Sequence, residues 1–166
     1  MAKYLKPGAK WGSLFGANEE FRTHPHRGAD LLYQEGAIVG FPTDATVSEV
    51  FWSDVLGWTV EFIDNEETFI QFSHLKEKPK SYRSGDHVLA GRPLGRCGNT
   101  GSASTGAHTH VAMSKKPHPH LVDYKHLIDP KKYWEAHEVP TTPVLEPSAK
   151  PRNQVSKPKR PRSSGK

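Results

Sequence analysis

Short apolar segments separated by glycines, prolines and polar turns follow one another through most of the chain. Some of them alternate in part, as in residues 57–64, where Thr59 and Glu61 alternate with Val60 and Phe62. Alternation of this kind over a short run is typical of a half-buried strand. We therefore expect strands over residues 28–33, 37–41, 45–52, 57–64, 68–75, 86–90 and 108–113.

A helical pattern is found only near the end of the apolar part of the chain. Residues 129–138 predict one short helix, with Asp129 as its N-cap and Pro130 at its first position. Residues 65–67 separate two strand segments by a hairpin-like distance. The pattern thus predicts a mainly β protein with one antiparallel sheet, arranged as a sandwich or barrel, and a short C-terminal helix.

The composition changes towards the C-terminus. We expect residues 1–137 to form a single domain and residues 138–166, rich in Pro, Lys, Arg and Ser, to be a disordered tail. The whole chain has 166 residues and a net charge of +5. All of that charge lies in the tail, and the body is neutral, which speaks against nucleic-acid binding by the body. A nucleic-acid-binding protein that acts through its tail stays open as an alternative.

The single cysteine limits which types of site are possible, and the lengths of the apolar runs limit where the protein can be. Cys97 is the single cysteine, so no intrachain disulfide and no cysteine-based zinc site is possible. No apolar run approaches the roughly 20 residues of a membrane span. The first residues lack the apolar region of a secretory signal. We expect synthesis in the cytoplasm without a leader of its own.

Candidate chemistry begins with the stretch HRGAD, residues 26–30. In an extended segment His26 and Asp30 project to the same face, and Gly28 between them leaves that face open. An imidazole and a carboxylate so placed can bind one metal ion. His24 falls outside this pair and is not expected to be a ligand.

Two further stretches add histidines. In HTH, His108 and His110 share a face, and we expect one of them as a third ligand and the other beside a bound water. His74 ends an apolar strand segment. Three protein ligands and an open fourth position are typical of a catalytic zinc site. The pKa of a water bound at such a site is lowered to about 7. The remaining histidines are expected to be structural or exposed: His87, His118, His120, His126 and His137.

These motifs, in this order, resemble those of the lysostaphin/LytM-type zinc metallopeptidases that cut peptidoglycan. The resemblance runs from about Trp11 to Trp134. It rests on H-x-G-x-D, on a strand ending in His-Leu, on the turn pattern between Gly85 and Gly95, and on the glycine-rich run from Gly98 to the second histidine of HTH.

The resemblance implies a fold and a set of roles. The fold would be a compact antiparallel sheet, the family's duplicated hybrid motif, with a groove walled by loops. One zinc ion per chain would be bound by His26, Asp30 and His110. His74 and His108 would be the unligated catalytic pair, with His108 as general base and His74 stabilising the tetrahedral intermediate, although these roles could be shared or exchanged.

The same resemblance implies an activity and a setting. We expect a zinc metalloendopeptidase, a monomer, that hydrolyses D-Ala–diaminopimelate or Gly–Gly bonds of bacterial peptidoglycan. We expect a phage endolysin made in the host cytoplasm and released onto the wall at lysis, or alternatively a virion-borne lysin. The basic tail could contact anionic wall polymers. The alternative activity is a non-catalytic module of the same fold that binds wall or a partner.

Overall fold

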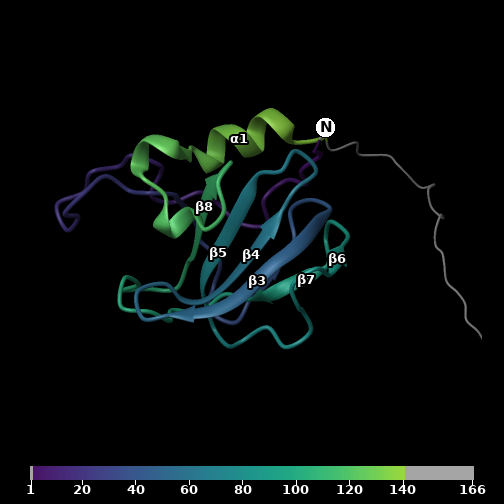
Figure 1. Cartoon of the computed structure of the whole chain (residues 1–166). Coiled ribbons are helices and arrows are strands. Elements are labelled where there is room, and N and C mark those ends of the chain that lie inside the picture. Colours follow the sequence, from purple (N-terminus) through teal and green to yellow (C-terminus); the bar gives the residue numbers. More distant parts are fainter. Residues whose placement is uncertain (1, 141–166) are drawn as a thin grey trace, which may run out of the picture.

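A seven-stranded antiparallel sheet forms the centre of the protein in the computed structural model, which describes residues 2–140 (Figure 1). The strands lie in the order β1-β8-β5-β4-β3-β6, and β9 also pairs with β8. They are β1 (Ala29–Leu31), β3 (Ala45–Ser53), β4 (Gly57–Ile63), β5 (Phe69–Leu75), β6 (His87–Val88), β8 (Thr109–Ser114) and β9 (Leu127–Ile128). A separate two-stranded sheet pairs β2 (Ile38–Gly40) with β7 (Pro93–Arg96).

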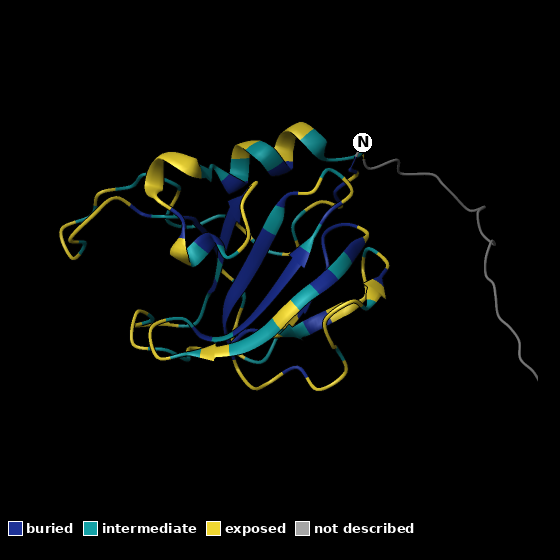
Figure 2. Cartoon of the chain, viewed as in Figure 1, coloured by how far each residue is buried: buried dark blue, intermediate teal, exposed yellow. Residues whose placement is uncertain are grey.

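The two faces of the large sheet differ in chemistry because side chains alternate along each strand. One face buries the apolar positions of the central strands, among them Val60, Phe72 and Val111, which are fully buried. The opposite face carries polar side chains that are equally buried, including Glu61 and Gln71. Figure 2 shows the central strands as the most buried part of the molecule and the loops around them as the most exposed. The polar face is therefore the place where a site can form.

Helix α1 (Pro130–His137) closes the apolar side of the sheet. Asp129 caps it by accepting hydrogen bonds from the backbone N–H groups of Lys131 and Lys132. Trp134 is 2% exposed, and its ring stacks on that of Phe72 with the centroids 6.3 Å apart. Its indole N–H donates to the backbone carbonyl of Leu5 at 2.7 Å. The helix is thus fixed at its start by a cap and in its middle by a buried aromatic.

The predicted fold class is confirmed: the sheet is antiparallel, and one short α-helix follows it where expected. Each predicted strand segment contains a strand, but the segment 28–33 contributes only Ala29–Leu31. The strands β7 and β9 were not predicted. The one-turn 3-10 helices η1 (Pro119–Leu121) and η2 (Tyr124–His126) were not predicted either.

The predicted tail, residues 138–166, falls mostly on residues 141–166, which lie outside the described part of the chain. The domain boundary after residue 137 stays a prediction. Val139, at the end of the described chain, donates its backbone N–H to the carbonyl of Tyr4 at 2.9 Å. Among residues 2–140, no helix has both the length and the apolar character needed to cross a membrane.

Candidate active site

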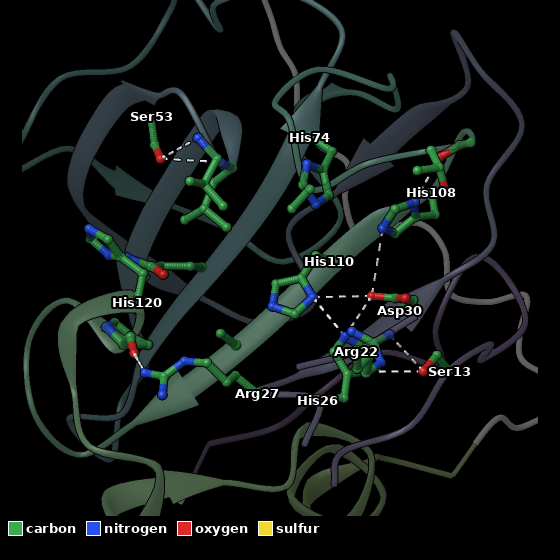
Figure 3. A pocket seen from close by; sticks show the side chains of 18 of the residues that line it. Ser13, Arg22, His26, Arg27, Asp30, Ser53, His74, His108, His110 and His120 are labelled. Atoms are coloured by element: carbon green, nitrogen blue, oxygen red, sulfur yellow. Dashed lines mark hydrogen bonds and ion pairs between the residues drawn. The ribbon is translucent and has the colours of Figure 1, made fainter. Parts of the chain in front are cut away.

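A groove of about 730 Å³ runs over the polar face of the sheet. Its floor is formed by side chains of β5 and β8, such as Gln71 and His110. Its walls come from four segments that are far apart in the sequence. The lining residues of these segments lie within 13–27, 53–56, 103–108 and 119–121, the last of which is η1. Figure 3 shows the histidines of these elements converging on the groove.

Three of the predicted site residues meet at one end of the groove. Asp30 on β1 lies directly opposite His110 on β8 in the sheet register. The distances are 3.1 Å from His110 Nδ1 to Asp30 Oδ1, 3.2 Å from His110 Nδ1 to His26 Nε2, and 3.3 Å from His26 Nε2 to Asp30 Oδ1. Among residues 2–140, these three residues are the one group of His, Cys, Asp and Glu side chains with the spacing of a metal site.

The predicted reason why these three side chains lie together was partly wrong. His26 and Asp30 were expected to share the face of one extended segment, but β1 begins only at Ala29, so that His26 lies in the preceding loop. The side chain of His26 reaches the site because the loop holds its Nδ1 3.1 Å from the carbonyl of Leu14. The pairing of Asp30 with His110 comes from the register between two strands, not from spacing along one of them.

The donor set fits zinc. With zinc–ligand distances of about 2.0–2.1 Å, a tetrahedral ion separates its ligand atoms by roughly 3.3–3.4 Å, close to the three distances above. Two imidazoles and a carboxylate are ligands that zinc accepts. The hydrogen bond from His26 Nδ1 to a backbone carbonyl leaves its Nε2 free for a metal, as is usual for metal-binding histidines.

The protonation states also suit metal binding. Burial alone would raise the pKa of Asp30, but its close contacts with His110 and His26 outweigh burial and hold that pKa well below its ordinary value. Burial lowers the pKa of His110. Asp30 is therefore ionised and His110 neutral at pH 7, which are the forms that bind a metal ion.

Gly28 explains the spacing of the H-x-G-x-D motif. A Cβ at this position would lie 2.1 Å from the carbonyl oxygen of Val111 and 2.8 Å from Cε1 of His110. Only glycine allows β1 to approach β8 this closely. The face that the sequence predicted to be open is in fact filled by the partner strand.

His74 and His108 lie beside this triad, with ring centroids 4.8 Å apart. Nδ1 of His74 donates to the carbonyl of Thr100 at 2.7 Å, and Nδ1 of His108 donates to the carbonyl of Gly106 at 2.8 Å. A neutral ring with this Nδ1–H bond keeps an unprotonated Nε2. Nε2 of His108 lies 3.8 Å from Asp30 Oδ1. Both histidines can accept a proton at the groove.

The backbone of His74 is left-handed, with φ of 64°, although His74 is not glycine. Such conformations are uncommon outside glycine and are often associated with functional positions. The backbone N–H of His74 donates to Leu56 at 2.8 Å, which holds the turned end of β5 in place. Burial lowers the pKa of His74 to about 4, so that the ring is neutral at pH 7.

Other residues of the groove were not found from the sequence. Gln71, Arg22 and Arg27 line it, and so does His120, which was expected to be structural or exposed. No local motif marks them, because their place depends on strand pairing and on loop packing. His24 also lines the groove and does not belong to the group of three; that it is no ligand stays a prediction.

The comparisons with known proteins agree on one family. The model of peptidase family M23 matches residues 24–123. The L-Ala–D-Glu endopeptidase of Bacillus subtilis (strain 168) is 27% identical over 111 residues, which cover 58% of this chain and 34% of that protein. The chain thus spans about a third of the length of this curated relative.

Two solved structures share the fold. The catalytic domain of lysostaphin from Staphylococcus simulans superposes with a TM-score of 0.65 at 24% identity, covering 76% of this chain and 92% of that one. A mutant of the catalytic domain of EnpA, a prophage-encoded M23 protein from Enterococcus faecalis, gives a TM-score of 0.64 at 22% identity, covering 80% and 96%. At these identities the likeness shows the fold.

Proposed function

The chain belongs to peptidase family M23, and from that premise we propose that it is a zinc-dependent endopeptidase that hydrolyses peptide bonds in the stems or cross-links of peptidoglycan. One observation carries the proposal: three side chains with metal-binding donor atoms and two further histidine rings meet at one end of a groove. Three ligands with neighbouring proton acceptors are what metal-assisted hydrolysis requires.

The triad would hold one zinc ion per chain through His26 Nε2, Asp30 Oδ1 and His110 Nδ1. When bound, zinc polarises a carbonyl group and makes water a better nucleophile near neutral pH. The protein contributes the orientation of the ligands. The backbone carbonyl of Leu14 fixes the tautomer of His26, and strand pairing fixes Asp30 against His110.

We propose His108 as the general base, because its unprotonated Nε2 faces the triad. His74 would stabilise the tetrahedral intermediate from its own side of the groove. Because Thr100 occupies the Nδ1 proton of His74, this ring can donate only after its Nε2 has received a proton. The two rings lie side by side, with their centroids 4.8 Å apart, so the two roles could also be shared or exchanged.

The bond that is cut is part of the proposal. The sequence predicted a D-Ala–diaminopimelate or a Gly–Gly bond. The relative from Bacillus subtilis is named for a third bond, between L-Ala and D-Glu within the stem. Mass spectrometry of the muropeptides released from walls of several chemotypes separates the three, because hydrolysis of each bond leaves a different new amino group.

We also propose a setting. The prophage-encoded relative of the same fold supports a phage endolysin that is made in the host cytoplasm and acts on the wall at lysis, with a virion-borne lysin as the alternative. The protein would act as a monomer. The basic tail would add electrostatic attraction to anionic wall polymers.

Clearing of purified cell walls tests the activity. The full chain should reduce the turbidity of a wall suspension, lose this activity when a chelator removes the metal, and recover it when zinc is added. A non-catalytic module of the same fold would bind the walls without clearing them. Binding without release of soluble peptide would therefore replace the proposed enzyme with that module.

A further inference from the structure

A sixth histidine of the groove, His120, lies away from the metal triad. It belongs to η1, which packs over the sheet, and its ring stacks on Phe51 at 5.1 Å with an angle of 28° between the planes. Figure 3 shows His120 on the side of the groove opposite Asp30 and His108. The ring lines the groove and is partly exposed to it.

A chain of hydrogen bonds behind His120 joins three neighbouring strands, β5, β4 and β3. Nε2 of Gln71 on β5 lies 2.8 Å from Oε1 of Glu61 on β4 and 2.6 Å from Nδ1 of His120. Glu61 and Gln71 are both fully buried. The other carboxylate oxygen of Glu61 accepts a hydrogen bond from Ser48 at 3.0 Å. A buried carboxylate thus anchors the side-chain amide that contacts His120.

This chain fixes the tautomer of His120. If the amide of Gln71 were turned around, its oxygen would lie about 2.8 Å from a carboxylate oxygen of Glu61, and the two would repel. The amide therefore points its NH₂ group at both neighbours. Nδ1 of His120 accepts one of these hydrogens, so the neutral ring carries its proton on Nε2.

The tautomer of His120 is opposite to that of the two proposed catalytic histidines. His74 and His108 use Nδ1–H for backbone carbonyls and present an acceptor, whereas His120 presents an N–H donor. The groove thus has proton acceptors near the triad and a hydrogen-bond donor farther along, on the wall formed by η1.

The charge around His120 limits what it can bind. Burial lowers its pKa, so the ring is neutral at pH 7 and does not attract anions as a cation would. Glu61 lies directly behind Gln71 and would repel a carboxylate. The partner that fits a neutral N–H donor beside a buried carboxylate is an uncharged oxygen acceptor, such as an amide carbonyl.

We infer that His120 is a substrate-binding residue that donates its Nε2–H to an amide carbonyl oxygen of the bound peptide, and that Gln71 and Glu61 are positioning residues that hold it in this tautomer. The inference rests on the proposed function for the identity of the ligand as a peptide. The hydrogen-bond chain behind His120 is independent of that function.

The tautomer is tested by long-range ¹H–¹⁵N correlation spectra of the full chain at neutral pH, with the His120→Phe variant used to assign the signals. We expect His120 to be protonated on Nε2 alone, and His74 and His108 on Nδ1. A His120 ring protonated on Nδ1, or on both nitrogens, would overturn the inference whatever the activity of the protein.

The role in binding is tested by kinetics with soluble muropeptides. His120→Phe keeps a ring to stack on Phe51 but has no donor, and we expect its KM to rise about five- to tenfold with little change in kcat. His120→Gln places an amide N–H near the position of Nε2 and should recover most of the loss. His87→Phe is the matched control, because His87 is an exposed residue of β6 outside the groove. The KM and kcat of this variant should equal those of the wild type.

Two results would refute the role of His120: unchanged KM in His120→Phe, or a His120→Gln variant no better than His120→Phe. If the wild type cleaves no muropeptide, the proposed function fails separately. Binding then decides the inference, because an added muropeptide should shift the Nε2–H signal of His120, and an unshifted signal would overturn it.

Discussion

At the scale of single residues, the groove is organised by backbone carbonyls that decide which nitrogen of each histidine faces it. The carbonyls of Leu14, Thr100 and Gly106 each accept an Nδ1–H, from His26, His74 and His108 in that order. The consequence is that three Nε2 atoms are available to a metal or a proton. Removing the ring of His74 or His108 should therefore affect proton transfer and leave metal binding in place, whereas removing His26 should affect both.

Substitution of His108 and His110 should separate proton transfer from metal binding. We expect His108→Ala to retain about one zinc per chain and to lose wall hydrolysis by roughly 10²- to 10⁴-fold, because it removes the proposed general base. We expect His110→Ala to lose both zinc and activity. Elemental analysis measures the zinc content and the rate of wall clearing measures hydrolysis. His87→Ala is the control and should change neither.

Acid should destabilise the metal-free protein through His74. The pKa of His74 is lowered to about 4 in the folded state, against its ordinary value of about 6.5. Between these values the unfolded chain binds the proton and the folded chain does not, so stability falls as pH drops from about 6.5 to about 4. The full effect is on the order of 3 kcal/mol.

Urea unfolding of the chelated protein at pH 7 and pH 5 measures this fall. His74→Asn is the suitable comparison, because Asn tolerates a left-handed backbone and has no titrating ring. The variant should lose less stability between the two pH values than the wild type. Equal losses in both proteins would show that His74 titrates normally in the folded state.

The sequence led to the five residues of the candidate site because each belongs to a local motif. It could not supply their geometry. Asp30 meets His110 across a strand pair 80 residues apart in the sequence, and His26 arrives from a loop. His120 and Gln71 are 49 residues apart and carry no motif, so only the folded chain shows that they touch.

At the scale of elements, the strands with clear apolar patterns were predicted and the irregular ones were not. Strand β7 contains Pro93 and Gly95, which interrupt an apolar pattern, and it forms because β2 lies beside it. Strand β9 and the helices η1 and η2 have two or three residues each, too few for a periodicity to appear. Such elements depend on tertiary contacts.

Helix α1 was predicted from its cap, and the cap should contribute measurably to stability. Asp129→Ala removes the acceptor for two backbone N–H groups, and we expect it to lower the free energy of unfolding by about 1 kcal/mol without changing zinc content. Asp123→Ala is a matched control, because Asp123 precedes η2 without a capping side-chain bond. Similar losses in the two variants, measured by urea unfolding, would contradict the assigned role of the cap.

At the scale of the whole molecule, one face of the sheet supports the core and the other supports the chemistry. The loops that wall the groove begin and end at strands of the same sheet or pack on it (Figures 1 and 3). The sheet thus positions Asp30, His74 and His110, and the loops beside it bring His26 and His108 to the same place. The excess of basic residues falls between positions 150 and 166 of the sequence, outside the described part of the chain.

Removal of residues 141–166 should separate hydrolysis from attraction to the wall. Zinc content and hydrolysis of soluble muropeptides should be unchanged, because the groove is formed by residues before 122. Retention on purified walls should decrease at low salt and equal that of the full chain at about 0.5 M salt, where charges are screened. Loss of hydrolysis of soluble muropeptides would show that the tail does more than attract the protein to the wall.

The identity of the bond that is broken tests the central claim most directly. Purified peptidoglycan is incubated with the zinc-loaded full chain, and the soluble products are analysed by mass spectrometry. The account predicts muropeptides with one kind of new amino group, absent after incubation with His110→Ala or with the chelated protein. Unchanged peptidoglycan, or the same products from His110→Ala, would contradict it.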